Sequence, residues 1–217
     1  MPTATDHSTP SHWDQVYAQN GEAGVSWYQP FPRWSLEQIR LLLPHRSLAL
    51  IDVGAGASTL VDELLLEGYQ NITLLDCSAV ALSLTRARLL ANSDLAHHCQ
   101  RVRWLQADLM THEFPHQSVD GWHDRAVFHF LTTEADRHRY RQQLDHALRP
   151  GGFLFLSTFA EDGPVRCSGH PVVRYSIETL EQAVGPGLKL VHHEHQRHRT
   201  PAGRVQIFLA ACFRAPP

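Results

Sequence analysis

The chain has 217 residues, of which 43% are hydrophobic and 19% are charged. This composition excludes a largely disordered protein and suits one globular domain. The formal net charge of −3 gives no long-range attraction to nucleic acid or to an anionic membrane, and no apolar stretch approaches the roughly 20 residues of a membrane span. Four cysteines without a C-x-x-C pair, in a chain without an apolar leader, indicate reduced thiols in the cytoplasm.

The first part of the chain predicts a tip and a helical cover. Residues 1–10 are small and polar and include prolines, which is typical of a disordered tip. Residues 11–45 predict two helices, the first opening with Ser11 and Asp14 as a pair resembling a capping box. We expect this cover to form one domain with a core at residues 46–217.

Beyond residue 48, short apolar runs alternate with helical segments, which is the pattern of a parallel sheet covered by helices on both faces. The last third instead predicts two strands joined by a turn at residues 200–203. The predicted fold class is therefore α/β, a doubly wound, mostly parallel seven-stranded sheet with a C-terminal antiparallel hairpin. The strands are expected at 48–53, 71–76, 102–107, 119–124, 151–159, 188–197 and 204–213. The helices between them are expected to be capped by Ser58, Ser78, Thr133 and Ser176, and the third is expected to stop at Pro150.

The first predicted strand runs into a glycine turn and then a helix start. Gly54 and Gly56 let the backbone bend sharply and approach a ligand without a side chain in the way. The third glycine of a dinucleotide-binding turn would stand at Thr59, and its absence counts against a nicotinamide-dependent dehydrogenase. The turn predicts ligand contacts at Gly54, Ala55, Gly56 and Ser58.

Three acidic residues, Asp52, Asp76 and Asp108, follow the carboxyl ends of successive predicted strands. Asp76 stands about 20 residues after the turn, where a carboxylate accepts the hydroxyls of an adenosine ribose. Asp108 is placed to reach the adenine amino group and Asp52 to face a methionine ammonium. Such acids favour a cationic ligand and repel a pyrophosphate, so they predict S-adenosylmethionine as the cofactor. A glycine turn or a helix-capping acid is also common in proteins without a ligand. The prediction therefore depends on all three acids standing at the carboxyl ends of successive strands.

These residues, with the segments Asp120–Phe130 and Leu148–Gly152, resemble class I S-adenosylmethionine-dependent methyltransferases over nearly the whole chain. The resemblance implies a Rossmann-like form of the predicted sheet and a methyltransferase enzyme. It extends the cofactor contacts to Cys77 and Leu109, which adjoin two of the acids. The motifs His12-Trp13-Asp14 and Val25–Tyr28 are most similar to short bacterial methyltransferases of unassigned substrate.

Two further resemblances are partial. The segment Trp122–Arg125 is similar to the Trp-Asp-Arg sequence of thiopurine and thiol methyltransferases, but His123 interrupts it. Protein lysine methyltransferases often have Asp-Lys-Gly near this place, and Arg125-Ala126 departs from it.

The residues after the fourth strand are the predicted catalytic group: His123, Asp124, Arg125 and His129. Methyl transfer from a sulfonium is an in-line displacement that depends mostly on positioning and the exclusion of water. An amine or hydroxyl acceptor must also lose a proton, which a histidine can take, whereas a thiolate needs no base. Asp124 is predicted to contact the methionine end or the acceptor, His123 also to contact the cofactor, and Arg125 is equally compatible with a buried ion pair.

Aromatic residues of the cover and a long loop complete the predicted site. The aromatic residues expected to fold over the cofactor are Trp13, Tyr17, Trp27 and Tyr28, although plain packing on the sheet is an equal alternative. The loop at residues 158–171 predicts a lid over the acceptor, because loops of this length usually bind or cover a ligand. The predicted lid contacts are Tyr28, Arg166, Cys167, His170 and Arg174, which suit an anionic or soft acceptor.

The sixteen histidines do not predict a metal site. Strand alternation separates His192 from His193 and His195, and no cysteine completes a tetrahedral set. The predicted function is methyl transfer to a small molecule such as a thiol or an amine. A protein lysine acceptor and a catalytically silent cofactor-binding module that regulates a partner remain alternatives. No nucleic-acid or membrane partner is expected, and a monomer or a homodimer fits.

Overall fold

A seven-stranded sheet forms the centre of the computed structural model, which describes residues 9–217. The strand order is β3-β2-β1-β4-β5-β9-β8, in which the first five strands are parallel and β9 is antiparallel to both of its neighbours, β5 and β8. The strands are β1 Ala49–Val53, β2 Asn71–Asp76, β3 Val102–Gln106, β4 Val119–Arg125, β5 Leu148–Phe159, β8 Lys189–Arg199 and β9 Val205–Arg214. A separate small hairpin joins β6 Arg166–Cys167 and β7 His170–Pro171. The predicted fold class is confirmed.

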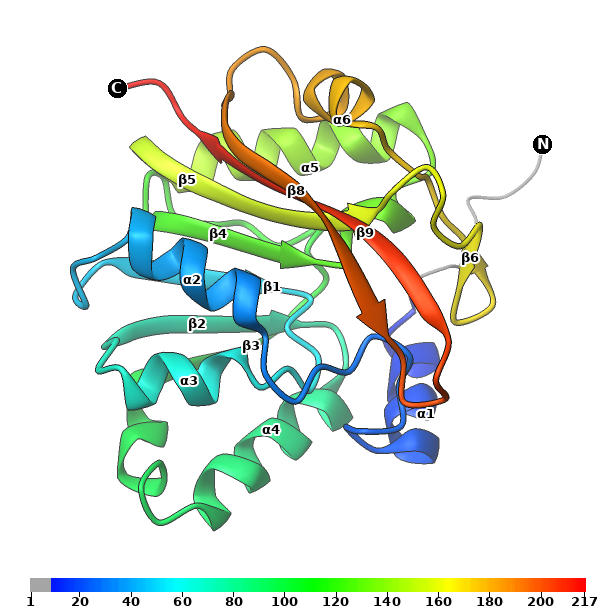
Figure 1. The fold of residues 1–217 in the computed structure, drawn as a ribbon. Helices are drawn as coiled ribbons and strands as arrows, with labels where there is room; N and C mark the ends of the chain where they lie inside the picture. The colour runs from blue at the N-terminus through cyan, green and yellow to red at the C-terminus, as the bar shows by residue number, and fades with distance from the viewer. Residues whose placement is uncertain (1–8) are drawn as a thin grey trace.

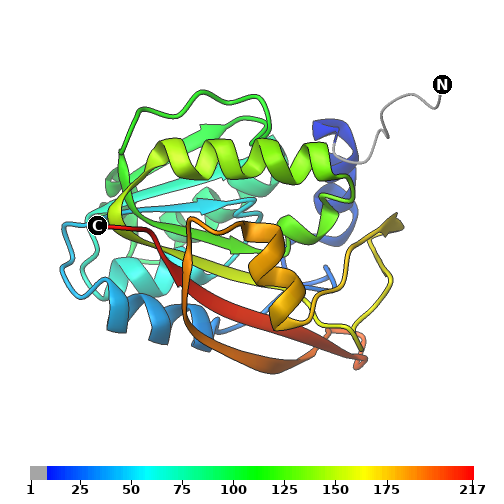
Figure 2. The ribbon, with the colours of Figure 1, turned by 90° about the horizontal axis from the view of Figure 1, so that it is seen from above.

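Helices cover both faces of the sheet, because alternate residues of each strand enter two different cores. In β1, Leu50 packs with helices α2, α3 and α4, whereas Ile51 and Val53 pack with α5 and α6. Figure 1 and Figure 2 show α2 and α5 on opposite faces of the sheet. The helices are α1 Pro10–Asn20, α2 Arg33–Leu42, α3 Leu60–Leu66, α4 Ala79–Ala91, α5 Glu134–Ala147 and α6 Ile177–Val184, with short 3₁₀ segments η1 Ala96–Arg101 and η2 Phe128–Phe130.

The N-terminal part differs from its prediction. Residues 1–8 of the predicted tip lie outside the described residues, whereas Pro10 already begins α1. The capping pair of Ser11 and Asp14 is wrong, since Thr9 is the N-cap and makes no side-chain cap bond. Asp14 instead accepts hydrogen bonds from the Ser78 hydroxyl at 2.6 Å and from Val80 N at 3.1 Å. It therefore ties α1 to the start of α4.

Three of the four predicted caps of the core helices are confirmed: the side chains of Ser78, Thr133 and Ser176 accept backbone N–H groups of the first turn. Before α3 the N-cap is Thr59 rather than Ser58, whose hydroxyl accepts from Leu60 N at 3.2 Å.

The boundary between α5 and β5 also moves. The helix predicted to stop at Pro150 ends at Ala147, and β5 begins at Leu148, three residues before its predicted start. Leu148 pairs with Val119 before an irregularity in the β4–β5 ladder, so the Pro-Gly-Gly segment lies inside the strand.

The architecture places one crevice at the carboxyl ends of the parallel strands. β1 has β2 on one side and β4 on the other, so the chain order reverses there, and α/β sheets bind ligands at such a switch point. Helix α1 lies beyond these strand ends (Figure 1). Among residues 9–217, no helix combines the length and apolar composition needed to cross a membrane.

Candidate functional site

A cavity lies at the switch point, and α1 and the loop at residues 21–32 form part of its wall. All predicted cofactor residues except Gly56 line it. They are Tyr17, Trp27, Asp52, Gly54, Ala55, Ser58, Asp76, Cys77, Asp108, Leu109 and His123. The predicted cofactor residues thus converge on one place, although they come from six segments of the chain.

The two glycines of the turn are required by backbone conformation and by close approach. Gly54 has φ +61° and Gly56 has φ +55°, which L side chains rarely adopt. A Cβ on Gly54 would lie 2.0 Å from Val127 Cγ2, and one on Gly56 would lie 2.1 Å from the Tyr17 hydroxyl oxygen. The turn is therefore packed against α1 and against the segment after β4, and it leaves a bare backbone wall on the cavity.

Asp76 is held at this wall by the backbone. One carboxylate oxygen accepts from Gly56 N and the other from Ser78 N, both at 2.7 Å. Burial raises the pKa of Asp76 to about 6, although the two backbone hydrogen bonds act against that rise. Each oxygen keeps a lone pair that can accept a hydroxyl hydrogen. Asp76 is therefore oriented as the prediction for a ribose requires.

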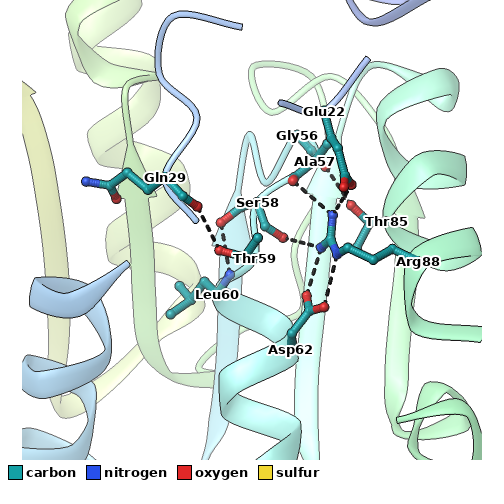
Figure 3. Close-up of polar contacts among 10 residues, drawn as sticks. All are labelled: Glu22, Gln29, Gly56, Ala57, Ser58, Thr59, Leu60, Asp62, Thr85 and Arg88. Carbon is teal, nitrogen blue, oxygen red and sulfur yellow. Dashed lines mark hydrogen bonds and ion pairs between the residues drawn. The ribbon is translucent and has the colours of Figure 1, made fainter. Parts of the chain in front are cut away.

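Arg88, which the sequence analysis missed, supports the turn from below. Its guanidinium donates to the carbonyls of Ala57 at 3.2 Å and Ser58 at 2.7 Å, and it pairs with Asp62 at 2.8 Å and Glu22 at 2.5 Å. Figure 3 shows this side chain between the turn, α3 and the loop after α1. Arg88 stands in a largely apolar helix beside a second arginine, so no local pattern distinguishes it.

Asp52 and His123 form a buried pair. His123 Nδ1 lies 2.6 Å from an Asp52 carboxylate oxygen, and Nε2 lies 2.9 Å from the Ser35 hydroxyl oxygen. Because both ring nitrogens are engaged and the residue is 2% exposed, His123 positions Asp52 at the cavity wall. This arrangement does not support a base role for His123, and Ser35 of α2 was not predicted.

Asp124 points to the opposite face of β4. It is fully buried and accepts hydrogen bonds from Val127 N at 3.0 Å, Phe128 N at 3.3 Å and the Tyr140 hydroxyl at 2.9 Å. Burial raises the pKa of Asp124 to about 6. This placement gives Asp124 a structural role and corrects its predicted contact with the cofactor or the acceptor.

His129 also lies outside the cavity wall. Its ring stacks on Phe159 at a centroid distance of 4.5 Å, and neither ring nitrogen has a hydrogen-bond partner among residues 9–217. Burial, with a smaller contribution from Arg125, lowers the pKa of His129 to about 3. A neutral, enclosed ring of this kind does not support the predicted role as a base toward the acceptor.

Of the four predicted catalytic residues, His123 and Arg125 line the cavity, and Asp124 and His129 do not. Arg125 Nη1 donates to the Trp27 carbonyl at 2.7 Å, and in the described part of the chain Arg125 forms no ion pair with a carboxylate. The alternative prediction of a buried ion pair is therefore wrong for residues 9–217. Burial lowers the pKa of Arg125 to about 10, so the guanidinium stays charged at neutral pH.

The predicted lid divides into two groups. Tyr28 and Cys167 line the cavity, and burial raises the pKa of the Cys167 thiol to about 12. Arg166, His170 and Arg174 do not line it. Arg166 and Arg174 donate to the carbonyls of Gly169 and Glu161, each at 2.6 Å, while His170 Nε2 lies 2.9 Å from His12 Nε2 of α1.

Aromatic rings form the wall near the lid. Trp13 lies edge-on to Trp27 and to Phe130, with centroid distances of 5.8 and 5.4 Å. Phe130 was not predicted, and its position in the short η2 turn carries no periodic signal. On β8, His192, His193 and His195 are exposed, and within residues 9–217 no three His, Cys, Asp or Glu side chains are arranged to hold a metal ion.

Comparisons with known proteins agree with this geometry. Residues 51–154 match the family model described as "Methyltransferase domain". The mouse protein EEF1A lysine methyltransferase 2 is 25% identical over 169 residues, which cover 69% of this chain and 65% of the relative. The chain spans between 19% and 65% of the length of three curated relatives that it matches.

Two solved structures share the fold. The Burkholderia thailandensis 1,6-didemethyltoxoflavin-N1-methyltransferase, with its acceptor and S-adenosylhomocysteine bound, superposes with a TM-score of 0.69 at 18% identity, covering 100% of this chain and 93% of that chain. The N-methyltransferase NodS from Bradyrhizobium japonicum WM9, with S-adenosylhomocysteine bound, has a TM-score of 0.68 at 18% identity, covering 95% and 100%.

Proposed function

We propose that this chain, a class I S-adenosylmethionine-dependent methyltransferase by family, transfers the cofactor's methyl group to a small-molecule acceptor by in-line displacement. The observation that carries the proposal is the wall formed by the bare Gly54–Gly56 backbone and the oriented carboxylate of Asp76. A Cβ on Gly54 would collide with Val127 and one on Gly56 with Tyr17, and both of these residues line the cavity. A carboxylate at the edge of this wall suits a ribose rather than a phosphate.

The residues of the cavity fit the cofactor part by part. Asp76 would accept the ribose hydroxyls, and Asp108, which is exposed and accepts from Met110 N at 2.8 Å, would face the adenine. Asp52, fixed by His123, would face the methionine ammonium. When bound, the cofactor supplies an electrophilic methyl group on a sulfonium. The rings of Trp13, Tyr17 and Trp27 attract such a cation and keep water from it.

Cofactor binding is tested by calorimetry and thermal unfolding with S-adenosylhomocysteine and, as control, NAD. We expect S-adenosylhomocysteine to bind and to raise the melting temperature, since a ligand that binds only the folded state stabilises it. NAD is expected to do neither. Binding of NAD without binding of S-adenosylhomocysteine or S-adenosylmethionine contradicts the proposal.

Turnover is tested with radiolabelled S-adenosylmethionine and a panel of thiols and amines. Label transferred to a small molecule supports the proposal. The relatives that methylate a lysine of eEF1A favour a protein acceptor as the second candidate. Label found only on an added lysine-containing protein such as eEF1A would select that candidate, and cofactor binding without any transfer would indicate a silent module.

A cytoplasmic location is part of the proposal. All four cysteines are free in the structure, and none is placed to form a disulfide with another. Reduced, mostly buried cysteines are typical of the cytoplasm.

A further inference from the structure

The two halves of the cavity differ in charge. The half at the ends of β1 and β2 carries Asp52 and Asp76, whereas the half between β4 and the lid carries Arg125 beside Cys167 and aromatic rings. Arg125 follows His123 on the same face of β4, and directly across the ladder from it lies Ser157 of β5. The guanidinium therefore lies on the acceptor side of the proposed reaction.

The guanidinium of Arg125 has fewer polar partners than its burial requires. Nη1 donates to the Trp27 carbonyl, and the flat face lies 5.3 Å from the centroid of the Phe208 ring. Nη2 is buried and has no hydrogen-bond partner among residues 9–217. Arg88, in contrast, has two carboxylates and two carbonyls around it.

The acids of the cavity are engaged elsewhere. Asp52 is bonded to His123, Glu22 to Arg88, and Asp76 to two backbone N–H groups. The two other acids of the lining, Asp108 and Asp136, accept from Met110 N and from the Thr133 hydroxyl. A buried charge without a counter-charge is costly, and a ligand that brings the counter-charge recovers that cost on binding. Among residues 9–217 the charge of Asp52 acts on Arg125, but no carboxylate lies within ion-pair distance of its guanidinium, so an anion that enters the cavity would supply a direct counter-charge.

We propose that Arg125 selects the methyl acceptor, which is a small molecule carrying a carboxylate on an apolar, aromatic-compatible body. This inference rests on the proposed function and names its substrate class. The guanidinium of Arg125, which lines the cavity, would pair with the carboxylate, while the rings of Trp13, Trp27 and Phe130 would contact the apolar body. A lysine ammonium at the same place would meet a like charge, which weighs against a protein lysine acceptor.

The test uses three probes of one shape and different charge: 3-phenylpropionate, 3-phenylpropionamide and 3-phenylpropylamine. Calorimetry at pH 7.5 measures their binding to the full chain saturated with S-adenosylhomocysteine. We expect the carboxylate to bind at least about tenfold more tightly than the amide, because a charge-assisted hydrogen bond is much stronger than a neutral one. The amine is expected to bind more weakly than the amide.

Variants assign the preference to one side chain. Arg125→Gln should bring carboxylate and amide within about twofold of each other, and Arg125→Lys should keep part of the preference. The matched control is Arg103→Gln, which removes an exposed arginine of β3 and should leave the preference unchanged. The dissociation constant for S-adenosylhomocysteine should stay within about twofold in Arg103→Gln. Both Arg125 variants should still bind S-adenosylhomocysteine, which also reports that they are folded.

Three results would overturn the inference. Equal binding of carboxylate and amide by the wild type would show that no anion is selected. A preference that survives in Arg125→Gln would place the selection elsewhere. Loss of S-adenosylhomocysteine binding in a folded Arg125→Gln variant would show that the guanidinium holds the cofactor carboxylate instead. Failure of the wild type to bind S-adenosylhomocysteine is a different result and contradicts the proposed function.

Discussion

At the scale of single residues, Asp76 combines orientation with a shifted protonation equilibrium. Two backbone N–H groups fix both carboxylate oxygens, while burial raises its pKa to about 6. A hydrogen bond from a ribose hydroxyl to this carboxylate favours its ionised form. Cofactor binding should therefore lower the pKa of Asp76 and release a proton. Affinity should therefore depend on pH near neutrality.

We predict that S-adenosylhomocysteine binds more weakly as the pH falls from 8 through 6 to 5, because a growing fraction of Asp76 must lose a proton first. The loss approaches about tenfold per pH unit below the pKa for one linked proton. Asp76→Asn should bind roughly ten- to a hundredfold more weakly at pH 8 and show no such slope. Calorimetry across this range measures both, with Asp94→Asn, an exposed acid outside the cavity, as control. A flat wild-type profile would contradict the linkage.

His129 predicts a pH dependence of folding stability rather than of cofactor binding. Its pKa is about 3 in the folded chain and about 6.5 when unfolded, so the unfolded state takes up a proton first as the pH falls. The contribution of the neutral His129 ring to the free energy of unfolding is intact above pH 6.5. It falls as the pH drops below 6.5, by about 2 kcal/mol at pH 5. His129→Phe, which can still stack on Phe159, should lack this loss.

Urea unfolding at pH 7 and pH 5 gives the change in the free energy of unfolding between the two pH values. This change should be larger for the wild type than for the variant. We also expect His129→Phe to retain methyl transfer, because the ring lies outside the cavity wall. An equal change in the free energy of unfolding for both proteins would refute the stability argument. A folded variant without methyl transfer would support His129 as the base.

At the scale of elements, the glycine turn depends on a clamp that joins α4 to α3 and to the loop after α1. Arg88 holds the carbonyls of Ala57 and Ser58 while it pairs with Asp62 and Glu22 (Figure 3). The side chain is 19% exposed, so water screens these pairs only in part. Removing the guanidinium leaves two acids and two carbonyls without their donor.

We predict that Arg88→Gln lowers the free energy of unfolding by about 2 kcal/mol, below the range for fully buried pairs because of the partial exposure. It should also weaken S-adenosylhomocysteine binding, since the turn loses its support. Arg86→Gln on the same helix removes an exposed arginine and should change stability by less than about 0.5 kcal/mol. Denaturant unfolding and calorimetry of both variants provide the measurements, and equal effects of the two substitutions would disprove the clamp.

At the scale of the whole molecule, the mostly parallel sheet, its C-terminal hairpin and the glycine turn could be predicted because their signals are local. Apolar runs, turn residues and caps each depend on a few neighbouring positions. The placement of the side chains at the end of β4 and after it could not be predicted in this way. Strand alternation sends Asp124 and Arg125 to opposite faces, but the face that holds the cavity is decided by α1 and the loop at residues 21–32, far away in the sequence. Asp14 was misassigned for the same reason, since its partners lie more than 60 positions away.

Trp27 connects the two halves of the cavity. Its indole N–H donates to the Tyr17 hydroxyl at 3.2 Å, next to Gly56, and its carbonyl accepts from Arg125. A molecule that orders this loop from one side therefore prepares the other side, so cofactor and acceptor should bind cooperatively, each raising the affinity of the other by the same factor. If that cooperativity is measured, departure of one product should weaken binding of the second, and release of both products would be linked through Trp27.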